Sequence, residues 1–177
     1  MNKLHQYSIQ FSSLKEGKYD FEFEIGKDLF DAFGNTEIID AEIVIKVLFE
    51  KNTTYLSLAF DIQGVVQTEC DRCLDPIEIE LDYCPSLYVN FGDETSDLTD
   101  IDDTMILARS EDSLELAKHF YDYVILNLPI QKYHPDNEDG SSTCNPEMLA
   151  KLENYMSGEV KSGDIDPRWE KLKNMYN

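Results

Sequence analysis

Strict alternation of apolar and acidic side chains constrains the fold of this 177-residue chain more than any other feature. Residues 19–25 read Tyr-Asp-Phe-Glu-Phe-Glu-Ile, so that every second side chain is apolar. Successive side chains of a β-strand point to opposite faces of the sheet, and this pattern therefore predicts a strand with one buried and one solvated face. The same period of two recurs at residues 41–49, 56–62 and 77–83.

These segments follow one another through short connections, which predicts an antiparallel β-meander sheet or a partly closed barrel. Residues 27–36 show no clear period and are predicted to be irregular. Gly64 interrupts the pattern after residue 62, and a glycine inside a strand favours a bulge or a tight bend.

The second half of the chain changes to helical spacing. Its apolar residues recur every three or four positions and predict an amphipathic helix that ends before Pro129: Leu114, Ala117, Tyr121, Val124, Ile125 and Leu128. Asn145-Pro146 and Asp166-Pro167 each predict the start of a short helix, because proline is favoured at the first helical position. Strands followed by helices predict an α+β fold, and we expect one domain over residues 1–177 that is mostly sheet at 1–91, an acidic loop at 92–103 and mostly helical at 104–177.

The charge of the chain restricts its partners. It has 36 acidic and 15 basic residues and a formal net charge of −21. A protein that grips nucleic acid needs a basic face, so the balance disfavours direct RNA contact and favours a basic protein partner. The basic residues between Lys161 and Lys173 keep RNA contact open as a rival. The acidic loop lacks the glycine and the terminal glutamate of a calcium-binding EF-hand, and we expect its aspartates to contact a partner: Asp97, Asp100, Asp102 and Asp103.

Cys70 and Cys73 are the residues with the clearest chemical potential. Two cysteines three positions apart in a turn can face one metal ion, but they supply only half of a zinc site. The residues that could complete it are Cys84, His134 and Cys144. The alternatives are a structural turn, in which Arg72 pairs with a local acid, and a redox pair. Redox chemistry is disfavoured, because Pro76 and a strand follow instead of a helix.

No nucleophile elbow, phosphate-binding loop or His-Glu-x-x-His motif occurs in the sequence, which therefore predicts no enzyme. The first residues do not resemble a signal peptide, and four cysteines are few for a secreted chain of this length. We expect a cytoplasmic protein whose thiols are reduced or bind a metal.

Several features occur in an order that resembles the YceD family, the large ribosomal RNA subunit accumulation proteins of bacteria and chloroplasts. The resemblance runs from about Ile38 to the C-terminus and rests on five segments: Gly64–Glu69, Cys70–Leu74, Asp82–Cys84, Tyr123–Ile130 and Asp166–Leu172. It implies a non-enzymatic bacterial factor that supports the synthesis, processing or stability of 23S rRNA.

We combine this resemblance with the charge and expect contacts with a basic large-subunit ribosomal protein or a pre-ribosomal particle, with Arg72 also at the interface. Many family members carry further cysteine pairs that could complete a zinc site. In this chain the resemblance implies Cys70, Cys73 and Cys144 as metal ligands, with His134 or Cys84 as the fourth. A zinc-binding or thiol-dependent protein that uses Cys70 and Cys73 is the alternative function.

Overall fold

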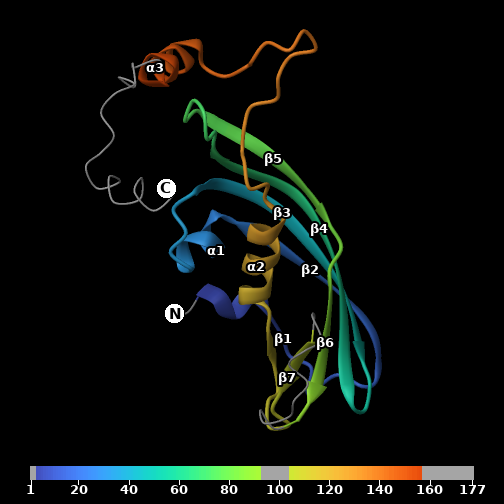
Figure 1. Ribbon diagram of the computed structural model, residues 1–177. Coiled ribbons are helices and arrows are strands. Elements are labelled where there is room, and N and C mark those ends of the chain that lie inside the picture. Colours follow the sequence, from blue (N-terminus) through green and yellow to red (C-terminus); the bar gives the residue numbers. More distant parts are fainter. Residues whose placement is uncertain (1–2, 93–103, 157–177) are drawn as a thin grey trace, which may run out of the picture. The chain divides into compact units, whose positions relative to one another are not determined.

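The computed structural model describes residues 3–92 and 104–156. Its chain forms two compact units, residues Met1–Tyr133 and His134–Asn177. Figure 1 shows the elements of both units, and each unit is described below by itself.

The first unit is built on three long antiparallel strands, β2 (Gly17–Gly26), β3 (Ile38–Lys51) and β4 (Tyr55–Glu69). The predicted alternation is confirmed in all three. Ile25 lies opposite Ile43, and Ile45 lies opposite Ile62, so the apolar side chains meet on one face. The strands are longer than the sequence pattern indicated, because the pairing of β3 with β4 continues past Gly64.

The other edge of β4 carries two strands in succession, β5 (Pro76–Tyr83) and β6 (Ser86–Phe91). They are separated at Cys84 and Pro85, where the carbonyl of Pro85 accepts a hydrogen bond from the backbone N–H of Phe60 (2.9 Å). A further strand, β7 (Thr104–Leu107), pairs with β6 in parallel. In the described residues these strands form one six-stranded sheet in which β2 pairs with β3 alone. The sheet is open, and the partly closed barrel is not formed.

A helix fills the concave side of the sheet, where a barrel would have its opposite wall (Figure 1). This helix, α2 (Ala117–Asn127), buries Phe120 completely. The Phe120 ring lies 5.1 Å from the ring of Phe23 and 6.1 Å from those of Phe60 and Tyr7, measured between centroids. Aromatic pairs at such distances add to the stability that area burial provides. The core therefore lies between α2 and the inner face of the sheet.

Two sequence predictions about local structure are wrong. Residues 27–36 were expected to be irregular, but the structure forms α1 (Lys27–Ala32), which buries Leu29 and Phe30. An i,i+4 ion pair between Lys27 and Asp31 (3.1 Å) supports this short helix.

Leu114 was placed in the long helix by its spacing, but it belongs to β8 (Leu114–Glu115). This strand pairs with β1 (Ser8–Ile9), which follows a 3₁₀ turn, η1 (Lys3–Tyr7). Leu114 is fully buried in the strand, and an apolar residue on the inner side of a helix is also expected to be buried, so the apolar spacing of the sequence could not separate the two.

The second unit contains α3 (Pro146–Met156), which begins at the predicted proline. The side-chain oxygen of Asn145 accepts a hydrogen bond from the backbone N–H of Glu147 (3.1 Å), as expected for a helix cap. The predicted acidic loop and the predicted helix after Asp166 lie outside the described residues. Among the helices of the described ranges, none has both the length and the apolar character needed to span a membrane.

Candidate functional site

The connection between β4 and β5 places Cys70 and Cys73 in a tight turn. The backbone N–H of Cys70 donates to the carbonyl of Asp75 (2.9 Å), and that of Leu74 donates to the carbonyl of Cys70 (2.9 Å). Leu74 adopts a positive φ of 64°, which few non-glycine residues do. Both thiols are buried, with at most 1% of either residue exposed. The turn therefore holds two sulfur ligands inside the protein.

Lys132 and Tyr133, at the end of the first unit, contact this turn. The backbone N–H of Asp71 donates to the carbonyl of Lys132 (2.8 Å), and the N–H of Lys132 donates to the Asp71 carboxylate (2.7 Å). The Arg72 guanidinium lies 4.1 Å from the centre of the Tyr133 ring. Such stacking is favourable for arginine. These contacts give Arg72 a place beside Tyr133, and they fix the backbone one residue before His134.

The second unit holds its own pair of potential ligands. His134 Nδ1 lies 3.8 Å from Cys144 Sγ, although ten positions separate the two residues. A bridge between Asp136 and Ser142 and a hydrogen bond from the Thr143 hydroxyl to the carbonyl of Pro135 (2.6 Å) close this loop. Cys144 is 4% exposed. The loop therefore supplies one nitrogen and one sulfur ligand.

The two pairs together comprise three cysteines and one histidine: Cys70, Cys73, His134 and Cys144. Three thiolates and one imidazole form a ligand set that zinc prefers. In a tetrahedron with zinc–ligand bonds of 2.0–2.3 Å, the edges measure roughly 3.5–3.8 Å. The separation of 3.8 Å between His134 and Cys144 is of that size. The donor chemistry of these residues fits a structural zinc site.

Cys84, the other suggested fourth ligand, belongs to a different group. It lies with Asp61 and Asp82, and its sulfur is 4.0 Å from the Asp61 carboxylate. Cys84 is exposed, whereas the other three cysteines are buried. Of the two residues suggested as the fourth ligand, His134 is the one that lies beside Cys144.

The acidic surface of the first unit is the second feature with functional potential. The four aspartates predicted to contact a partner, Asp97, Asp100, Asp102 and Asp103, lie outside the described residues. The sheet itself has a strongly acidic side, which we call the outer face: the side chains of β2–β5 that point away from α2. Its acidic members are Asp20, Glu22, Glu24, Asp40, Glu42, Glu50, Asp61, Glu69, Glu78, Glu80 and Asp82. Against these eleven acids, the outer face carries two lysines, Lys18 and Lys46.

Comparison with known proteins identifies one family. Residues 58–176 match the family described as large ribosomal RNA subunit accumulation protein YceD. This range covers about two thirds of the chain and includes the Cys70–Cys73 turn, α2 and α3. Searches of curated proteins and of solved structures found no match.

Proposed function

The chain belongs to the YceD family of large ribosomal RNA subunit accumulation proteins, and on this basis we propose that it is a non-enzymatic factor that supports 23S rRNA accumulation during assembly of the large ribosomal subunit. The family match is the observation that carries this proposal. In a bacterial cell this role places the protein in the cytoplasm, where ribosomes are assembled.

We further propose that the protein acts through a basic ribosomal protein and not through direct contact with RNA. The formal net charge of −21 repels a polyanion, and the outer face concentrates acids on one side of the sheet. Ribosomal proteins are strongly basic, and complementary charge accelerates the encounter of two proteins. A bound acidic protein would also cover basic surface until the ribosomal protein meets rRNA.

The test is depletion of the protein from growing cells, followed by measurement of the 23S to 16S rRNA ratio and mapping of 23S precursor ends. We expect a selective fall in 23S rRNA that the wild-type gene restores. Crosslinking in the restored cells should then recover a basic protein of the large subunit. An unchanged ratio after complete depletion would refute the proposed role.

A second candidate function, zinc binding, is favoured by the buried Cys70–Cys73 turn and the His134–Cys144 pair. When bound, zinc would supply a structural crosslink among the four side chains and no reaction chemistry. The residues' own role is to present two thiolates from the Cys70–Cys73 turn, and one thiolate and one imidazole from the His134–Cys144 loop. Such a site is compatible with the ribosomal role, since it would stabilise the fold that makes the contacts.

Metal analysis of the full-length protein, purified without a histidine tag, tests zinc binding. We expect about one zinc per chain, and loss of most of it in Cys70→Ser/Cys73→Ser, because two remaining ligands bind zinc weakly. Cys84→Ser is the matched control, since Cys84 lies in the other group. Wild-type protein without zinc after growth in zinc-supplemented medium, or equal loss in the control, would refute this site.

A further inference from the structure

The outer face combines its acids with large apolar side chains that are exposed to solvent. Leu48 is 43% exposed and Val44 is 39% exposed, both on the central strand β3. Asp20 lies beside Leu48 in the sheet, and Glu24 lies beside Val44. A face that served solubility alone would not need aliphatic residues at these positions. Apolar patches rimmed by polar residues are typical of surfaces that bind other proteins.

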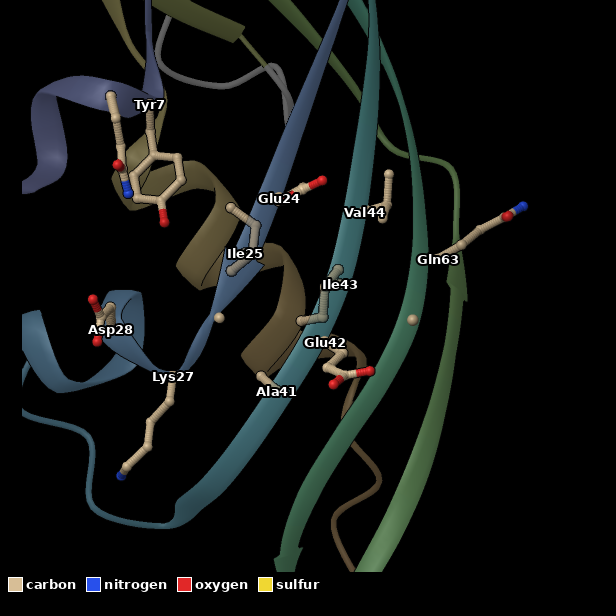
Figure 2. A pocket seen from close by; sticks show the side chains of 13 residues that line it. Tyr7, Glu24, Ile25, Lys27, Asp28, Ala41, Glu42, Ile43, Val44 and Gln63 are labelled. Atoms are coloured by element: carbon tan, nitrogen blue, oxygen red, sulfur yellow. The ribbon is translucent and has the colours of Figure 1, made fainter.

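A hollow of about 640 Å³ adjoins this face, where β2 ends and α1 begins (Figure 2). Gly26 and Gly64 contribute backbone without side chains to its lining. The apolar residues among those that line the hollow include Ile25, Ile43 and Val44. The carboxylates among the lining residues belong to Glu24, Asp28 and Glu42. Figure 2 shows Glu24, Val44 and Gln63 pointing away from α2, whereas Ile25 and Ile43 point toward it.

The chemistry of the hollow suits one kind of side chain. Lysine and arginine have long aliphatic stems that favour apolar surroundings and cationic heads that favour carboxylates. A stem lying along Val44 would bring its head to the level of Glu24 and Glu42, where charge-assisted hydrogen bonds are stronger than neutral ones. An acidic side chain would be repelled by these carboxylates, and an uncharged one would gain no charge-assisted hydrogen bond from them.

We propose that the outer face is a docking surface for a basic segment of a partner protein, with a lysine or arginine of that segment entering the hollow and its aliphatic residues covering Val44 and Leu48. The proposal rests on the proposed function and names the surface and the chemistry of the partner. Eleven acids against two lysines make a cationic segment complementary to this face. A second copy of the chain would instead bring carboxylates against carboxylates.

The test uses two fluorescent peptides of equal charge, one of alternating lysine and valine and one of alternating lysine and glycine. Their affinities for the full-length protein are measured by fluorescence anisotropy. We expect Glu24→Gln/Glu42→Gln to weaken binding of both peptides about tenfold, because two close ion pairs are lost. Leu48→Asn should weaken binding of the valine peptide about threefold and leave the glycine peptide unchanged. All of these side chains are exposed, and circular dichroism verifies that the variants remain folded.

The matched control is Glu147→Gln/Glu153→Gln, which removes the same charge from exposed residues of α3. We expect it to change peptide affinity less than twofold at 150 mM salt, because it leaves every carboxylate of the outer face in place and salt screens the remaining change in net charge. If the control weakens binding as much as Glu24→Gln/Glu42→Gln does, the peptides sense only net charge, and the docking surface is refuted. Equal effects of Leu48→Asn on both peptides would refute the apolar contact.

Complementation separates this inference from the proposed function. If depletion lowers 23S rRNA and the Glu24→Gln/Glu42→Gln variant restores it as well as the wild type does, the docking surface is wrong and the ribosomal role stands. If depletion leaves 23S rRNA unchanged while the peptide results are as expected, the surface binds a basic segment and the ribosomal role is wrong.

Discussion

Gly64→Ala tests how closely the two central strands approach one another. A Cβ atom at Gly64 would lie 2.2 Å from the carbonyl oxygen of Glu42 and 2.6 Å from the Cα atom of Ile43. Both are backbone atoms of β3, held by the ladders that β3 forms with β2 and β4. Relief of the clash therefore requires the strands to separate by about 1 Å or more, since ordinary contacts begin near 3.4 Å.

The expected loss of stability combines three effects. Overpacking costs about 2 kcal/mol. The φ of +156° at Gly64 costs a residue with a side chain about 2 kcal/mol. The smaller entropy of unfolded alanine offsets about 0.7 kcal/mol. The free energy of unfolding should thus fall by about 3 kcal/mol, which corresponds to a lower melting temperature by about 9 °C for a chain of this size.

Urea unfolding followed by circular dichroism at 25 °C measures this loss, and two glycines provide matched controls. Gly17 has a similar φ of +147° but no atom within 4 Å of an added Cβ, so Gly17→Ala should cost only the backbone strain of about 1–2 kcal/mol. Gly26 has an ordinary φ and a nearest contact of 3.8 Å, and Gly26→Ala should cost less than about 1 kcal/mol. If Gly64→Ala is no more destabilising than Gly17→Ala, the close approach of β3 and β4 is refuted.

Three further predictions concern the core, the titration of a histidine and the metal. Phe120→Ala should lower the free energy of unfolding by about 4 kcal/mol, because the ring is fully buried, whereas Leu126→Ala on the same helix, where the side chain is 81% exposed, should change it by less than about 0.5 kcal/mol. Burial lowers the pKa of His119 from its ordinary value near 6.5, an effect that Asp122 opposes and Lys118 strengthens. The unfolded chain then binds more protons below pH 6.5, so His119 should make stability fall as the pH drops from 7 toward 5. Urea unfolding of wild type and His119→Gln at several pH values should show their difference changing in that direction, and a constant difference would contradict it. If zinc is bound, a chelator should lower the melting temperature of the wild type and of Cys84→Ser but not that of Cys70→Ser/Cys73→Ser, since a ligand stabilises only a fold that binds it.

The long strands were predictable because their signal is local. In β2, β3 and β4 the side chains alternate over seven or more residues, and burial on one face of the sheet follows that alternation directly. The helix α1 was not predictable in this way. Six residues are too few to show a helical period, and α1 is stabilised by burial of Leu29 and Phe30 against distant parts of the chain.

Gly64 shows a second limit of structure prediction from the sequence. Its interruption of the pattern indicated a bulge or a bend, yet the pairing of Ile43 with Gly64 is regular, and the register shift lies at Ile38 and Asp40. A missing side chain in a sequence signals that something approaches the backbone, but it does not say what approaches. Here the neighbouring strand does so on one side, and the hollow opens beside it.

For the candidate metal ligands, sequence spacing predicts only those that are close together in the chain. The spacing of Cys70 and Cys73 indicated half of a site, and it left Cys84, His134 and Cys144 equal as partners. Cys84 follows β5 at the end far from the turn, because eight residues of strand carry the chain away from Cys73. The segment after α2 returns to the turn through Asp71 and Arg72, and His134 comes next in the chain.

The outer face of the sheet carries two kinds of residue that have different explanations, acids and exposed aliphatic residues. Alternation alone explains why acids occupy every second position of β2, because a solvated sheet face needs polar residues. It does not explain Val44 and Leu48, which interrupt the polar side of β3 and remain exposed. Exposed aliphatic residues on an open sheet favour aggregation unless charge or a partner protects them. The surrounding carboxylates keep like surfaces apart while admitting a cationic segment, so solubility and selective docking can follow from the same arrangement of residues.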